Sequence, residues 1–113
     1  MAYSNLEERG GISGLSMAAD ANGTPLDARG VVRGSVQYVW SGASATNATI
    51  KLQQSNNGTN WHDISGSSVT VAAASGAGLV EMSGITTALI RAVFTRNAET
   101  TGTITAHFML KGR

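Results

Sequence analysis

The sequence contains no cysteine and a single proline, and it has only two residues each of tryptophan, tyrosine and phenylalanine. The absence of cysteine excludes disulfides and thiolate metal sites. No apolar run approaches the roughly 20 residues of a membrane-spanning helix, so we expect no membrane partner. Charged residues make up 13% of the chain and the net charge is +1. This balance argues against nucleic-acid binding.

Glycine, alanine, serine, threonine and asparagine make up more than half of the 113 residues. A low share of charge is unusual for a free cytosolic monomer, whose solubility depends on charged side chains. It fits a protein that is packed in an assembly or exposed outside a cell. The N-terminal segment lacks the basic and apolar regions of a signal peptide. If the protein acts outside a cell, we therefore expect it to leave by lysis or inside a particle.

The stretch from Ile50 to Ser65 shows the fold class most clearly. Ile50 and Leu52 alternate with polar residues at the period of a half-buried strand. Residues 56–58, Asn-Asn-Gly, adopt positive φ at low cost and reverse the chain. Trp61 and Ile64 then begin a returning strand. This pattern predicts antiparallel β-structure.

Similar short segments recur at regular spacing from residue 31 onward, separated by turn residues. They predict an all-β fold, an antiparallel β-sandwich or jelly-roll-like barrel of six to seven strands over residues 31–113. The expected strands are 31–40, 48–54, 61–64, 68–73, 79–82, 89–95 and 103–111. Alternation predicts a core of Val36, Tyr38, Trp40, Ile50, Leu52, Trp61, Ile64, Val69, Val71, Leu79, Val93, Ile104, Phe108 and Leu110.

Residues 1–30 show no sustained period and are interrupted by glycines. A disordered leader is one interpretation. The other is an extended N-terminal arm that lies on a neighbouring subunit, which we favour because disordered tails carry fewer apolar residues and more charge. The expected anchors, which would bind the partner, are Leu6, Ile12, Leu15, Met17 and Leu26.

The chain offers little catalytic chemistry. His62 and Asp63 are sequence neighbours, and neighbours in a strand point to opposite faces, which works against a dyad. His107 is expected on a solvent face. Histidines and acids show no metal-ligand spacing, and no nucleophile elbow or phosphate loop is present. We expect no enzyme activity, no catalytic or metal-binding residue and no cofactor.

Trp61 leaves two interpretations open. A tryptophan beside a turn can stack on a sugar, with Asn57, Asn60 and His62 as further ligand-facing residues. It can equally cover the core. A Ca²⁺ site from Asp63 with the asparagines is conceivable, although turn chemistry explains those residues. The three Asn-x-Thr sequons are expected by chance in so Asn- and Thr-rich a chain.

Three runs of residues carry a resemblance. They are Trp40-Ser41-Gly42 with Thr49 to Gly58, then Asn60-Trp61, Asp63-Ile64 and Ser65 to Ser67, and finally Leu89 to Arg96 with Gly102 to Ala106. Together they resemble small β-sandwich virion proteins of tailed bacteriophages, of the capsid-decoration, head-fibre or tail-associated type. The resemblance covers about residues 31–111 and contains no catalytic residues.

The resemblance implies a structural virion component, made in the host cytoplasm and located in the virion. It would bind the assembled capsid or another virion protein through its arm and sheet edges. A homo-oligomer is expected. One alternative is a module that binds a glycan or a host surface through the turn at residues 57–62. A further alternative is a self-assembling shell or tail-tube subunit.

Overall fold

The computed structural model describes the backbone of residues 6–112 and the side chains of residues 12–112. Its regular elements are all strands. They are β1 (Leu6–Ser16), β2 (Ala21–Asn22), β3 (Leu26–Asp27), β4 (Val31–Ser41), β5 (Thr49–Ser55), β6 (His62–Asp63), β7 (Val69–Thr70), β8 (Gly76–Ser83), β9 (Leu89–Thr95) and β10 (Thr103–Gly112). The prediction of an all-β antiparallel sandwich is confirmed.

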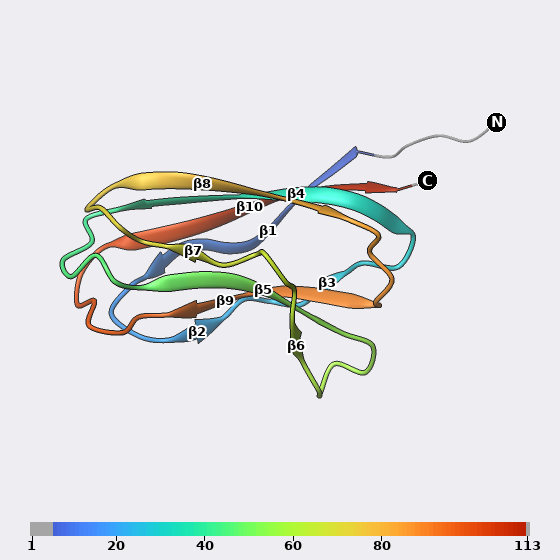
Figure 1. Cartoon of the computed structure of the whole chain (residues 1–113), viewed down its shortest axis with the longest axis horizontal. Helices are drawn as coiled ribbons and strands as arrows, with labels where there is room; N and C mark the ends of the chain where they lie inside the picture. The colour runs from blue at the N-terminus through green and yellow to red at the C-terminus, as the bar shows by residue number, and fades with distance from the viewer. Residues whose placement is uncertain (1–5, 113) are drawn as a thin grey trace.

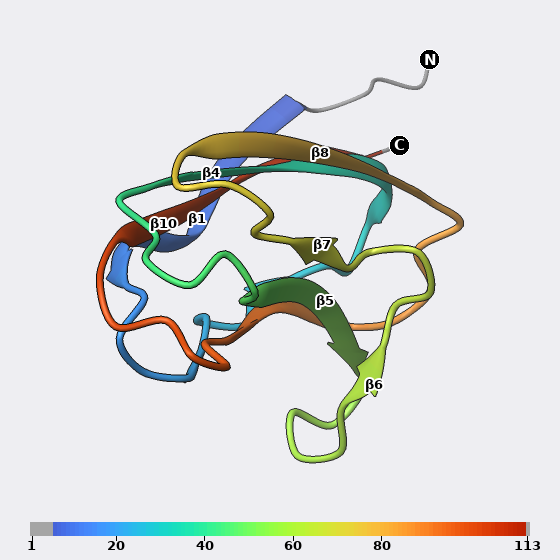
Figure 2. The same ribbon diagram turned by 60° about the vertical axis from the view of Figure 1, so that its left-hand side comes forward.

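The strands form two antiparallel sheets, which lie as two layers in Figure 1 and Figure 2. Sheet A has the order β1-β10-β4-β8. Sheet B has the order β2-β9-β5-β6, with β3 also paired to β9 and β7 to β5. The long neighbours β4 and β10 pair without a register shift from Thr103–Ser41 to Lys111–Arg33. The predicted strands from residue 31 onward correspond to β4–β10.

The N-terminal segment belongs to the same two sheets. β1 pairs with β10, whereas β2 and β3 pair with β9. Residues 1–30 were expected to be an arm on a neighbouring subunit, yet from Leu6 onward they contribute strands to their own chain's sandwich. The physical reason is that β1 satisfies main-chain donors and acceptors along β10 that would otherwise form an open edge. Residues 1–5 lie outside the described part.

The core lies between the sheets and follows the predicted alternation in β4, β5 and β10. The inward side chains of these strands are buried, and each large one contributes about 1.5–3 kcal/mol relative to exposure. Ile64 and Val69 are half-buried against the core. The confirmed buried residues are Val36, Tyr38, Trp40, Ile50, Leu52, Val71, Ile104, Phe108 and Leu110.

Three predicted core residues face outward instead. In β8, Gly76 and Gly78 lie inward above the side chains of Trp40 and Val69, so Leu79 points out and is 64% exposed. In β9, the inward face carries Ile90, Ala92 and Phe94, which turns Val93 outward. Trp61 packs on the outside of sheet B. In β8 and β9 both faces carry apolar residues, so alternation alone could not tell which face is inward.

Candidate functional site

The outward face of sheet A exposes large hydrophobic side chains. Val39 is 40% exposed, Leu79 64% and Met109 39%. The register places Val39 between Ala77 and Thr105 on the neighbouring strands. Leu79 and Met109 lie on β8 and β10, one and two rows further along the sheet. The row that contains Leu79 also carries Gln37 and His107, so polar side chains separate Val39 from Met109 on this face.

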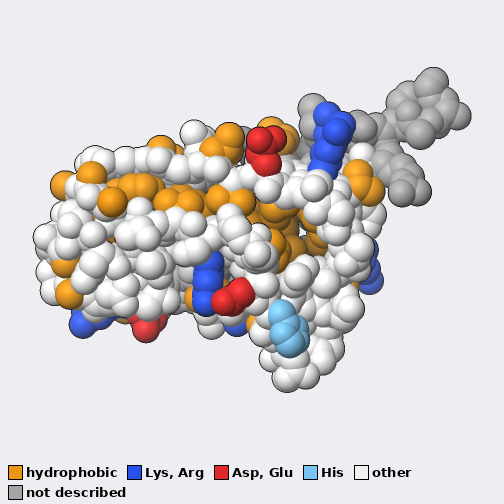
Figure 3. Space-filling model, in the orientation of Figure 1, with side chains coloured by type: hydrophobic (Ala, Val, Ile, Leu, Met, Phe, Trp, Pro, Cys, Tyr) orange, Lys and Arg blue, Asp and Glu red, His pale blue; other side chains and the backbone are white. Residues whose placement is uncertain are grey.

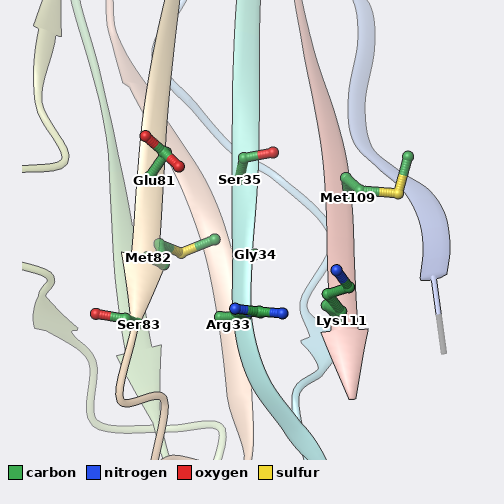
Figure 4. Close-up of a pocket in the computed structure, with 8 residues that line it drawn as sticks. All are labelled: Arg33, Gly34, Ser35, Glu81, Met82, Ser83, Met109 and Lys111. Carbon is green, nitrogen blue, oxygen red and sulfur yellow. The ribbon is translucent and has the colours of Figure 1, made fainter. Parts of the chain in front are cut away.

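Charge gathers at one end of the same face. Arg33 and Lys111 are register partners on β4 and β10, and Glu81 lies one row away on β8. Figure 4 shows Arg33 in one row with Ser83 and Lys111, across three strands. These residues line a shallow hollow of about 580 Å³. Within the described part of the chain, neither Arg33 nor Lys111 forms an ion pair.

The four sheet edges differ in how they are protected. β1 pairs with β10 through two register shifts, which twist an edge away from flat pairing. The edges of sheet B consist of β2, β3, β6 and β7, which have two residues each. β8 differs, because it has eight residues and pairs with β4 without a shift. Main-chain hydrogen bonds from β8 to other described residues run only to β4.

Sheet B carries a polar network on its outward face. The guanidinium carbon of Arg91 lies 4.2 Å from the centroid of the Trp61 ring. Arg91 donates through Nε and Nη2 to the Gln53 side-chain oxygen, at 3.1 and 2.8 Å. Gln53 and Lys51 donate in turn to the two carboxylate oxygens of Asp63. These bonds hold the pKa of Asp63 below its ordinary value, and the bond from Gln53 contributes most to this shift.

The turn after β5 is held by its own side chains. The Asn57 side-chain oxygen accepts the N–H groups of Thr59 and Asn60, both at 2.9 Å. The Ser55 hydroxyl accepts the N–H groups of Asn57 and Gly58 and donates to the Asn57 side chain. Asn57, one of the two asparagines that were expected to face a ligand, thus uses its side-chain oxygen within the turn.

A hollow of about 360 Å³ lies beside this turn. It is lined by polar residues: Gln54, Ser55, Asn56, Asn57, Asn60, His62 and Thr87. Three of the four predicted ligand-facing residues therefore meet, while Trp61 is absent from the lining and packs on Arg91. The core interpretation of Trp61 and the sugar-platform interpretation both missed its partner, which lies thirty residues away in sequence on β9.

The five predicted anchors lie as follows. Ile12 is 6% exposed and Met17 is fully buried, both in the core of their own chain. Leu15 and Leu26 are half-buried against that core. Leu6 starts β1, and its side chain lies outside the described residues. The large apolar side chains that the described structure exposes are instead Val39, Leu79 and Met109. Alternation had placed Val39 and Met109 outward and Leu79 inward.

Glu99 is a buried carboxylate that the sequence did not single out. It is fully buried, and its Oε1 accepts the N–H groups of Ser44 at 2.8 Å and of Ala45 at 2.6 Å. These bonds, chiefly that from Ala45, outweigh burial and lower the pKa of Glu99. Its Oε2 has no hydrogen-bond partner among the described residues. Glu99 therefore ties the loop after β9 to the loop after β4.

Within the residues that the structure describes, no three histidine, cysteine or acidic side chains cluster as metal ligands would. The same part of the chain contains no helix that is long and apolar enough to cross a membrane.

No protein-family model and no curated protein matches the chain. Solved structures do match it. The SPBc2 prophage-derived protein YomS superposes with a TM-score of 0.63 at 12% identity, covering 99% of this chain and 97% of that one. The fold is shared with a prophage-derived protein. FLHE superposes with a TM-score of 0.52 at 17% identity, covering 99% of each chain. At these identities the likeness is one of fold.

Proposed function

We propose that the protein is a structural virion component of a bacteriophage that attaches to the assembled particle, as a capsid-decoration or head-associated protein. The observation that carries this proposal is the outward face of sheet A, where Val39, Leu79 and Met109 expose apolar surface. Large apolar side chains that are exposed on one face of a sheet are suited to an interaction surface when a partner covers them. The proposed partner is a virion protein that presents an apolar patch of its own.

Composition and fold support this role. Only 13% of the residues are charged, which suits a chain that is packed against other subunits. The resemblance over residues 31–111 points to tailed-phage virion proteins, and the fold is shared with the prophage-derived protein YomS.

Attachment through a sheet face differs from attachment through an arm. Ile12 and Met17 stabilise their own chain and are not free to anchor it elsewhere. The sheet A face instead offers a preformed surface that loses little conformational entropy on binding. A single contact of this size is weak, but many copies on one symmetric particle convert weak contacts into firm attachment.

The experiment is to purify particles of the phage whose genome encodes the chain and to measure its copy number per particle by quantitative mass spectrometry. The proposal expects a constant copy number, comparable to or a simple fraction of that of the shell subunit, which survives repeated density-gradient purification. A trace amount that falls with each purification would refute a structural role.

The polar hollow beside the turn favours a second candidate, a module that binds a glycan on a host surface. Asn60 and His62 line this hollow of about 360 Å³ and keep their side chains exposed. Amide and imidazole groups hydrogen-bond sugar hydroxyls. A glycan array would test this candidate with the wild-type chain and with Asn60→Ala and His62→Ala. Hits that both variants lose would support it, and an array without hits would remove it.

A further inference from the structure

The β8 edge is the one long, regular edge in the described part of the sandwich. Natural sheet proteins blunt their edges with short strands, bulges, proline or lysine, because an open edge pairs with other chains. The remaining edges show these devices, including Pro25 just before β3. β8 shows none of them: its sequence GAGLVEMS has no proline, no basic residue and one acid, Glu81. An edge left open in this way is suited to pairing.

We propose that β8 pairs antiparallel with β8 of a second copy of this chain, about a two-fold axis at Leu79. Such an axis, perpendicular to the sheet, keeps the outward face of each copy on the same side. Sheet A then continues across the axis into sheet A of the second copy. Two-fold contacts of this kind use the same surface on both subunits, so one self-complementary strand is sufficient.

The sequence of β8 is complementary to itself in this register. Small residues fill its first half and larger residues its second half, with Leu79 between them. Around an axis at Leu79, Gly76 of one copy faces Met82 of the other, Gly78 faces Val80, and Ala77 faces Glu81. Each small residue thus receives a large one. The two Leu79 side chains, each 64% exposed in the single chain, cover one another.

Charge selects the same register. An axis at Glu81 would set two carboxylates directly opposite one another, which destabilises a strand pair. With the axis at Leu79, each Glu81 lies opposite Ala77, and the two carboxylates are four residues apart along the strands. At about 3.4 Å per residue this separation exceeds the screening length of roughly 8 Å at physiological salt.

The side of the sandwich below β8 also has apolar surface to cover. Figure 3 shows hydrophobic side chains along this side, with a hollow between the two layers. The hollow has a volume of about 300 Å³ and includes the half-buried Ile64, Val80 and Ile85 in its lining. A second copy beside β8 would remove part of this surface from water, which adds to the main-chain hydrogen bonds of the new strand pair.

Self-pairing through β8 does not depend on the proposed attachment to a particle. It would leave the outward faces of two sheets A side by side, so that Val39 and Met109 of both copies face one target. A chain that dimerises but never enters a particle would refute the virion role alone. A monomeric chain that is found in particles would refute the pairing alone.

The first test is the mass of the full chain by light scattering over a wide range of concentration, for the wild type and for two variants of Ala77. We expect a concentration-dependent dimer. Ala77→Glu sets like charges against Glu81 and should weaken it, whereas Ala77→Lys sets opposite charges and should tighten it. Because the axis repeats each contact, the expected change in dissociation constant is about threefold to tenfold in each direction. A monomer throughout, or equal effects of both variants, would overturn the proposal.

The second test is cross-linking with single cysteines, since the natural chain has none. Directly opposed residues of antiparallel strands have Cα atoms about 4.5–5.5 Å apart, within the range that a disulfide spans. Leu79→Cys should therefore form a covalent dimer under mild oxidation. Val39→Cys is the control. Val39 lies on the same face but on β4, and the β4 strands of the two copies would be three strand spacings of about 4.8 Å apart.

Cross-linking of Leu79→Cys alone supports the edge pair. Equal cross-linking of both cysteines would show association through the faces of sheet A and would overturn the proposal. So would a dimer by light scattering in which Leu79→Cys remains uncross-linked, because that dimer would use another surface. Circular dichroism of each variant confirms that the sandwich is intact before its result is counted.

Discussion

Arg91 stacks on the ring of Trp61, with its guanidinium carbon 4.2 Å from the ring centroid, on the outward face of sheet B. The other tryptophan, Trp40, is 7% exposed and donates its indole N–H to the Ala73 carbonyl at 3.0 Å. The two tryptophans of this chain thus lie in different environments. One covers a polar network on the outside and the other fills the core beneath β8.

This difference predicts unequal costs of truncation. Trp61→Ala removes a cation–π contact at a partly exposed site and should cost about 1 kcal/mol of unfolding free energy. Trp40→Ala leaves a large cavity in the core and should cost roughly 3–5 kcal/mol. Urea unfolding followed by circular dichroism measures both. Equal losses would mean that Trp61 is a core residue after all.

Gly34 and Gly78 provide a matched pair for the packing of sheet A. A β-carbon at Gly34 would stand 2.7 Å from the main-chain oxygen of Met109, which cannot move without disturbing the β4–β10 pairing. At Gly78 it would stand 3.1 Å from a methyl group of Val69, a looser contact with a half-buried side chain and not with the main chain. Gly34→Ala should cost roughly 1–3 kcal/mol, and Gly78→Ala less. Thermal unfolding of both variants tests this order, and a reversed order would contradict the register.

Glu99 predicts a pH dependence. The folded chain lowers the pKa of this carboxyl from its ordinary value of 4.5 through the amides of Ala45 and Ser44. The resulting stability is present above pH 4.5 and is lost as the pH falls through the lowered pKa. Glu99→Gln should therefore be less stable than the wild type at neutral pH, and the difference should shrink in acid. Melting temperatures of both proteins from neutral pH to about pH 3 measure it. A constant difference would contradict the charged role.

The sequence predicted the long, strictly alternating strands well. In β4 and β10 one face carries mostly large apolar side chains and the other mostly polar ones. Alternation alone was therefore enough to place Val36, Tyr38, Ile104 and Phe108 inside. β8 could not be placed in this way. Its inward glycines leave room for Trp40 from another strand, and that long-range packing decides which way Leu79 points.

Long-range pairing also explains the other differences. Met17 looked like an exposed anchor, but its N–H donates to the Gly102 carbonyl at 2.9 Å, which draws the side chain into the core. Glu99 resembles an ordinary loop acid in sequence, and only the fold brings the amides of the loop after β4 to its carboxylate. Of the turn residues, Asn57 accepts two main-chain N–H groups within the turn, and it lines the same hollow as Asn60 and His62.

The outward face of sheet A carries the proposed function, and Val39 lies on its second strand from the edge. The most direct measurement is co-sedimentation of the purified chain with particles that were assembled without it. Val39→Lys would be compared with Thr95→Lys, which adds the same charge to the outward face of sheet B. We expect saturable binding of the wild type and of Thr95→Lys, and roughly tenfold weaker binding of Val39→Lys. Equal binding of all three proteins, or none by the wild type, would contradict this expectation.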